Sequence, residues 1–178
     1  ALRARSRGAL PGNALVITFD DGYADNAEVA VPILQRHGLR ATFFVATHFL
    51  DGGRMWNDTV IECVRQCVLP TLDLASFGLE AFPLSDAASR RRAINALLPK
   101  LKYASLSERE EGLQRLHGLA GQPRLDDGLM MRSDQVVGMH QAGMEVGGHT
   151  VRHPILTELS DADALAEIDQ GRQRLQAI

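Results

Sequence analysis

The sequence predicts an α/β fold that corresponds to the first part of a (β/α) barrel. Two runs rich in β-branched and aliphatic residues, at 14–19 and 41–47, flank a helix-length segment with short connections. This order favours two parallel strands joined by a crossover helix. A third apolar run, at 144–146, follows after a long intervening segment. Polar motifs directly follow the first and third runs, at the strand ends where (β/α) barrels carry their functional residues.

The N-terminal part is predicted to be a tail followed by the first helix. Residues 1–13 contain three arginines and are expected to form a solvated tail, whereas 14–178 are expected to form one domain. Asp25 is expected to cap a helix that continues to about His37.

The middle of the chain is predicted to be a helical insertion between the second and third strands. Over about 51–128 the composition becomes charged and helical, with no strand signal that would extend the sheet. Ser85 is expected to cap one helix of the insertion. Ser107 and Glu110 are expected to form the capping box of the next one.

Two helices are predicted to frame the third strand. One covers 134–141 after Ser133, and the other begins at about Asp161 behind the N-cap residue Ser160. Three strands are too few to close a barrel, so the sequence predicts an open sheet with exposed edges.

The first polar motif places Asp20 and Asp21 before Gly22, at the end of an apolar run. Neighbouring ionised carboxylates repel each other unless one is protonated, solvated or bound to a cation. A glycine lets the chain turn, so both acids can reach one pocket. Taken alone, the motif is more typical of a capped turn than of a site.

The second polar motif places His149 and His153 four residues apart between glycines and a proline. With Asp21 they would supply three nitrogen and oxygen ligands and leave one position open, as in catalytic zinc sites. Zinc is the expected ion, and cobalt or nickel would suit the same ligands. The alternative is a pair of solvated histidines. The joint occurrence of both motifs favours one divalent metal ion.

Together the motifs resemble those of the polysaccharide deacetylase family, also called carbohydrate esterase family four or the nodulation-deacetylase homology domain. The resemblance covers about 15–178. It rests on Thr18-Phe19-Asp20-Asp21-Gly22 and His149-Thr150-Val151-Arg152-His153, supported by Ala41-Thr42-Phe43-Phe44-Val45 and Ala142-Gly143-Met144-Glu145-Val146-Gly147.

The resemblance implies a role for each motif residue and a larger fold. Asp20 would be the general base, and Asp21, His149 and His153 the metal ligands, with Thr150 hydrogen-bonded inside the histidine motif. Members of the family form a distorted (β/α)7 barrel. Their remaining motifs, which carry an arginine, a tryptophan and a late Leu-x-His, would have to follow Ile178. The chain is therefore expected to be truncated, weakly active or inactive, and to self-associate through an open sheet edge.

The expected function is metal-dependent removal of N-acetyl groups, with O-acetyl groups as the second choice, from an acetylated polysaccharide or oligosaccharide. The reaction would be hydrolysis of a carbon–nitrogen bond in a linear amide. Two alternatives stay open, a hydrolase of a small cyclic amide or ureide and an inactive, metal-containing carbohydrate-binding module. Trp56 is predicted either to border a glycan cleft or to anchor the insertion to the core.

Composition excludes some partners. The net charge of −3 gives no sign of nucleic-acid binding. No apolar run approaches the roughly 18 residues of a transmembrane segment. Cys63 and Cys67, four apart in a predicted helix, are interpreted as two buried thiols, which leaves the compartment open.

Overall fold

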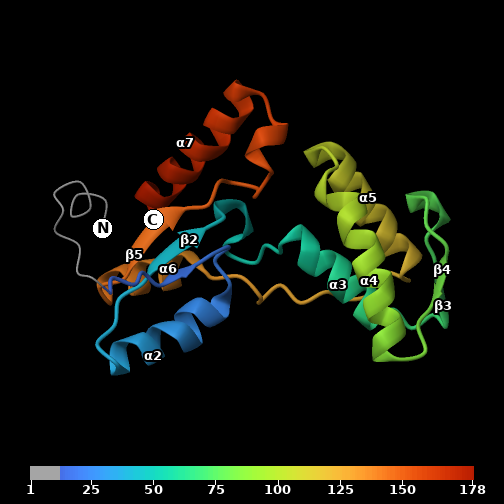
Figure 1. Cartoon of the computed structure of the whole chain (residues 1–178), viewed down its shortest axis with the longest axis horizontal. Helices are drawn as coiled ribbons and strands as arrows, with labels where there is room; N and C mark the ends of the chain where they lie inside the picture. Colours follow the sequence, from blue (N-terminus) through green and yellow to red (C-terminus); the bar gives the residue numbers. More distant parts are fainter. Residues whose placement is uncertain (1–12) are drawn as a thin grey trace.

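A computed structural model describes residues 13–178 of the chain, which adopt a mixed α/β fold (Figure 1). The three arginines of the predicted tail lie outside the described residues. A three-stranded sheet with its helices forms one side of the molecule, and a helical lobe forms the other. None of the described helices is long and apolar enough to cross a membrane.

The sheet contains the three predicted parallel strands, β1 (Thr18–Phe19), β2 (Thr42–Val45) and β5 (Glu145–Gly148), in the order β1-β2-β5. Phe43 is paired with a residue on each side and is fully buried. The prediction of a buried strand over 14–19 was wrong in part, because Leu15 is 82% exposed. No described strand pairs with the outer edge of β1, so little buries this segment. The described residues form no closed barrel.

Helical elements pack around the sheet: η1 (Asn26–Ala30), α2 (Val31–Arg36), α6 (Ser133–Gln141) and α7 (Asp161–Ala177). The first predicted helix exists but is divided into the π-turn η1 and α2. Pro32 has no N–H to give to the preceding turn, which accounts for the wider turn before it. The core of this half is formed by residues of β2, α2, α6 and their connections: Val31, Leu34, Ala41, Phe43, Val45, Leu50, Met131, Val136, Met139 and Met144.

The helical lobe consists of α3 (Trp56–Gln66), α4 (Ala87–Lys102), α5 (Leu106–Leu119) and a hairpin of β3 (Thr71–Asp73) and β4 (Ala81–Pro83). The hairpin was not predicted, and it forms a separate sheet. The lobe has a hydrophobic core of its own, which includes Val60, Cys63, Val64, Leu72, Leu97 and Leu116. Cys63 and Cys67 are free and buried, as predicted.

Two helix caps of the lobe differ from the prediction, and α6 begins at Ser133 behind Arg132 and not after Ser133. Asp86, not Ser85, caps α4, because its carboxylate accepts a hydrogen bond from the backbone N–H of Ser89. Ser105 forms the capping box of α5 with the glutamate three residues later, so this helix begins two residues earlier than expected. A second Ser-x-x-Glu pattern close by, starting at Ser107, made the two starts indistinguishable by sequence.

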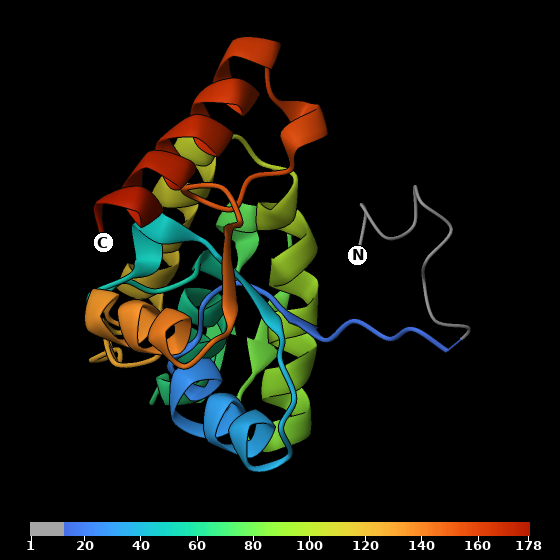
Figure 2. The ribbon, with the colours of Figure 1, turned by 90° about the vertical axis from the view of Figure 1, so that its left-hand side faces the viewer.

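The chain leaves the sheet for the lobe and returns at neighbouring positions. The backbone N–H of Asp51 donates to the carbonyl of Met131 at 3.1 Å. The Asp51 carboxylate also accepts hydrogen bonds from the N–H and hydroxyl of Ser133, both at 2.7 Å. Further along, the guanidinium of Arg54 donates to the carbonyl of Asp126. Seen from the sheet side, α4 and α5 lie behind the strands (Figure 2).

Candidate metal centre

Three predicted site residues lie together at the ends of β1 and β5. The Oδ1 atom of Asp21 is 3.5 Å from the Nε2 atom of His149 and 3.5 Å from that of His153. The two imidazole nitrogens are 3.1 Å apart. An ion with tetrahedral bonds of about 2.0–2.1 Å separates its ligand atoms by about 3.3 Å. The three atoms therefore fit one metal ion, and the described residues contain no second group of this kind.

The aspartate turn (residues 20–22) is bent so that Asp21 faces the histidines. Asp21 has a φ of +74° and Gly22 a φ of +93°, both in the left-handed region. The carbonyl of Asp21 accepts a hydrogen bond from the N–H of Ala46 at 3.1 Å, which fixes the turn against the end of β2. A side chain at position 22 would press on Val45 in addition to being strained, so glycine is required there.

Thr150 fixes the histidine loop (residues 149–153) by linking the backbones of its two histidines. Its hydroxyl donates to the carbonyl of His149 at 2.5 Å and accepts from the N–H of His153 at 3.0 Å. Thr150 and His153 both have positive φ, at 65° and 55°. Left-handed conformations of non-glycine residues are costly and gather at functional sites. These hydrogen bonds are those expected inside the histidine motif.

Helix α7 supports the histidine loop from outside. One carboxylate oxygen of Glu167 accepts hydrogen bonds from the N–H groups of Val151 and Arg152, each at 2.8 Å. Gly171, one turn further, lies against the backbone of Thr150, where a Cβ atom would come within 3.2 Å of the carbonyl. A side chain at position 171 would force the helix and the loop apart by a few tenths of an ångström.

We expect Glu167→Ala to weaken metal binding about 10- to 100-fold, the range for residues that orient metal ligands. The substitution removes both charge-assisted hydrogen bonds that fix the loop. Zinc titration monitored by calorimetry measures the effect. Asp169→Ala is the matched control, since it removes a charge from the same helix but only surface contacts to Arg172 and Gln173. Equal affinities of the two variants would contradict a supporting role for Glu167.

The electrostatics of the site suit a metal ion. Burial lowers the pKa of His153, and the charges of His149 and Arg109 add to this effect while the Asp21 carboxylate opposes it. A lowered pKa favours the neutral imidazole, which is the form that ligates metals. The Asp21 and two histidine side chains are 26% to 36% exposed, so one side of the cluster remains open to solvent.

Asp20 precedes this cluster but is not part of it. It is exposed, and its carboxylate has no hydrogen-bond partner among residues 13–178. Its backbone carbonyl accepts the N–H of Gly22 at 3.0 Å, which closes the turn. The two adjacent carboxylates therefore lie in different surroundings, and only that of Asp21 contacts the imidazoles.

A second polar cluster, which the sequence did not predict, ties the aspartate turn to the lobe. The Tyr23 hydroxyl donates to Asp58 at 2.9 Å and accepts from the amide of Asn57 at 3.4 Å. Burial raises the pKa of Tyr23 above its usual range, and burial also raises the pKa of Asp58, with a further contribution from the Asp21 charge. Residues 34 and 35 apart in sequence give no spacing signal, so only the fold reveals them.

Trp56 is the first residue of α3 and packs inside the lobe, beside a cavity. Its ring packs against the lobe core, and the guanidinium of Arg109 lies over it, 4.9 Å from the ring centre. It also lines a cavity of about 300 Å³ together with His48 and Arg152. One face of the ring is therefore occupied by the protein.

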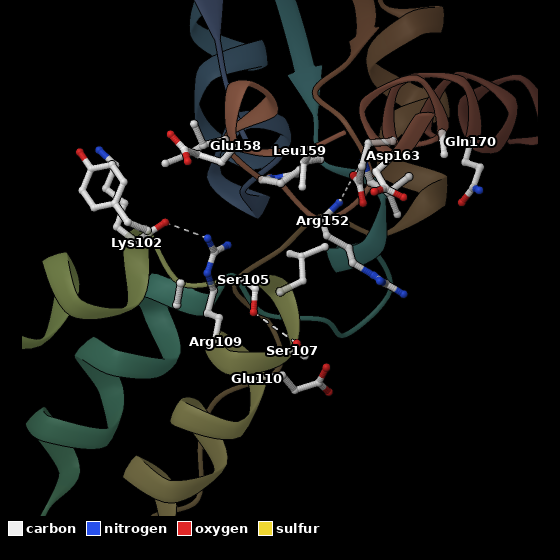
Figure 3. Close-up of a pocket in the computed structure, with 18 residues that line it drawn as sticks. Lys102, Ser105, Ser107, Arg109, Glu110, Arg152, Glu158, Leu159, Asp163 and Gln170 are labelled. Carbon is white, nitrogen blue, oxygen red and sulfur yellow. Dashed lines mark hydrogen bonds between the residues drawn. The ribbon is translucent and has the colours of Figure 1, made fainter. Parts of the chain in front are cut away.

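A larger cavity of about 890 Å³ separates the lobe from α7 and the histidine loop (Figure 3). Lys102, Ser105 and Arg109 come from the lobe, and Arg152 and Asp163 from the opposite wall. Both cavities are lined by Leu106, Arg109, Glu110 and Arg152, so they adjoin. Neither is lined by Asp21, His149 or His153. The cavities instead flank the candidate metal centre through the histidine loop.

The chain is similar to several known proteins. The family model for polysaccharide deacetylase matches residues 7–178. The chain is 52% identical over 31 residues to the putative polysaccharide deacetylase YxkH of Bacillus subtilis (strain 168), which covers 17% of this chain and 11% of that protein. The Streptococcus pyogenes deacetylase PplD in complex with acetate aligns structurally with 98% of this chain and 47% of its own, at 20% identity and a TM-score of 0.49.

The chain belongs to the polysaccharide deacetylase family, because the family model covers nearly all of it. This confirms the resemblance seen in the aspartate and histidine motifs. The chain covers less than half the length of each of the two relatives.

Proposed function

We propose that the protein is a metal-dependent hydrolase that removes N-acetyl groups from a polysaccharide. The observation that carries the proposal is the cluster of Asp21, His149 and His153, whose ligand atoms lie 3.1–3.5 Å apart with one side open. Membership of the polysaccharide deacetylase family supports the reaction class. Zinc suits two imidazoles and one carboxylate, and cobalt or nickel would suit them as well.

Each residue has a distinct part in the proposed reaction. Asp21, His149 and His153 hold the ion, and Thr150 and Glu167 keep the histidine loop in shape. A divalent ion bound there supplies Lewis acidity toward the acetyl carbonyl and lowers the pKa of water. Asp20, adjacent but outside the ligand set, takes a proton from the attacking water. The exposed position of its carboxylate leaves it accessible to that water.

The two adjoining cavities favour a long substrate over a small cyclic amide. They form an open groove that begins beside α7 and continues past the histidine loop to Trp56. A small ureide would instead require a closed pocket. We further propose that the three parallel strands belong to a distorted seven-stranded barrel, into which residues 51–128 are inserted.

We expect the 178-residue chain to release acetate from acetylated chito-oligomers slowly and only with metal present. The rate should be low because no third imidazole joins the metal cluster in the described residues, so the leaving amine lacks an evident proton donor. Acetate is quantified before chelation, after chelation and after adding zinc back.

Substrate comparisons separate the alternatives. An acetylated xylan oligomer tests O-acetyl removal, and hydantoin tests the cyclic-amide alternative. Oligomer binding without acetate release at saturating zinc would favour the inactive binding module. Acetate release that survives chelation would overturn the metal-dependent mechanism.

A further inference from the structure

The smaller cavity is distinctly cationic. Arg54, Arg109 and Arg152 line it, and Glu110 is its one carboxylate among the described residues. The whole chain carries a net charge of −3, so this concentration of positive charge is not a general property of the surface. The arginines come from the start of the lobe, from α5 and from the histidine loop. Segments far apart in sequence therefore bring like charges to one place.

Arg109 is the buried member of the three, with 6% of its surface exposed. Its Nε and Nη2 atoms donate to the carbonyls of Leu101 and Lys102, at 3.0 and 2.9 Å, at the end of α4. These carbonyls and the ring of Trp56 partly compensate its charge. Its Nη1 atom has no acceptor among residues 13–178, and no carboxylate pairs with it there.

Capping of α4 explains Arg109 but not the other two arginines. Arg54 donates only to the backbone carbonyl of Asp126. Arg152 is exposed, and its guanidinium has no hydrogen bond within the described residues. Neither is ion-paired within the described residues. Arg109 and Arg152 belong to opposite walls of the adjoining larger cavity (Figure 3).

The surroundings of the arginines suit a sugar that carries a negative charge. The cavity is also lined by Phe49 and Trp56, and aromatic side chains provide contact area for sugar rings. A guanidinium matches the planar carboxylate of a uronic acid and the oxygens of a phosphate in a forked geometry. Arg152 belongs to the histidine loop, so a sugar bound here would lie against the loop that carries two of the candidate metal ligands.

We propose that this cavity is a subsite for an anionic sugar of the substrate, which makes the substrate an acetylated acidic polysaccharide. The inference rests on the proposed function for its glycan, but not on the metal or on turnover. Uronate and phosphate groups share the required chemistry. A nucleic acid would also present negative charge, but it carries no acetyl group that could lie beside the metal centre.

Binding is measured directly on the 178-residue chain, using the fluorescence of Trp56. It is the single tryptophan of the sequence and it lines the cavity. The probes are an oligogalacturonate, a chito-oligomer of equal length, a chito-oligomer bearing phosphate groups, and a single-stranded DNA oligomer. We expect at least one of the two anionic glycans to bind about tenfold more tightly than the neutral oligomer, with an affinity that falls as salt rises. The stronger of the two identifies the anionic group.

The double variant Arg54→Gln, Arg152→Gln tests the site. It removes two partly solvated charge pairs between arginine and the anionic glycan, so the affinity for that glycan should fall roughly tenfold. Binding of the neutral oligomer should change little. The matched control is Arg91→Gln with Arg92→Gln, two exposed arginines of α4 that do not line the cavity. Arg109 is left intact, because its removal would also uncap α4.

Three results would overturn the proposal: equal binding of anionic and neutral glycans, equal losses in the double variant and its control, or DNA binding as tight as that of the anionic glycan. Failure of the deacetylase activity is a separate outcome, since binding requires neither metal nor acetate release.

Discussion

Replacing His149 or His153 by alanine is expected to abolish divalent-metal binding. Each substitution removes one of three ligand atoms that lie within 3.5 Å of each other, and the described residues form no other group of three potential ligands. Metal content should fall from about one ion per chain to background. In the unsubstituted chain, zinc at 100 times its Kd should stabilise the fold by about 2.7 kcal/mol. Both variants should lose this stabilisation in thermal unfolding.

His140→Ala is the control for this experiment. His140 is an exposed imidazole on α6 and lies outside the cluster. Its removal should leave both metal content and zinc-dependent stabilisation unchanged. Metal binding that persists in both the His149 and His153 variants would refute the assignment of the centre.

Asp20→Asn should lower acetate release by about 10²- to 10⁴-fold, the usual effect of losing a general base. Metal content should remain nearly intact, since the Asp20 carboxylate does not contact the imidazoles. Asp21→Asn should instead remove the metal, and the activity with it. Both quantities are measured on the same samples, by metal analysis and by acetate release from acetylated chito-oligomers.

The Asp21→Asn substitution is expected to leave the backbone of the turn unchanged. Asp21 has a positive φ, and asparagine tolerates that conformation better than most residues do. Asp21→Asn therefore changes the ligand while keeping the turn. Equal loss of metal from both variants would show that the roles of the two aspartates have been divided wrongly.

Much of the sheet could be predicted because its signals are local. The apolar runs gave the three parallel strands, and Ser160 gave the start of α7, where its hydroxyl accepts from the N–H of Asp163. The length of β1 could not be predicted. An apolar run indicates that a segment can be buried, but it does not indicate whether a neighbouring strand is present to bury it. The hairpin of β3 and β4 is only three residues per strand, too short for a periodic signal.

The candidate metal centre also contains residues that the sequence could reveal and residues that it could not. Asp21, His149 and His153 could be proposed because each belongs to a short motif with its own spacing. Glu167 and Asp58 could not, since each acts on its motif from a different element. The arginines of the cationic cavity were missed for the same reason. Arg109 in particular looks like any charged residue of an amphipathic helix until its burial is known.

The hydrogen bonds between Asp51 and residues 131 and 133 have a consequence for how such a protein can diversify. The chain enters and leaves the lobe beside β2, where Asp51 is hydrogen-bonded to residues 131 and 133. The lobe carries its own core. Residues 59–128 can therefore lengthen, shorten or be exchanged without altering the register of β2 and β5, whereas Asn57, Asp58 and residues 129–131 must stay because they hold the chain just after Asp21. One wall of the groove would change with them, while the candidate metal centre stayed the same. Evolution of substrate preference is thereby uncoupled from evolution of the chemistry.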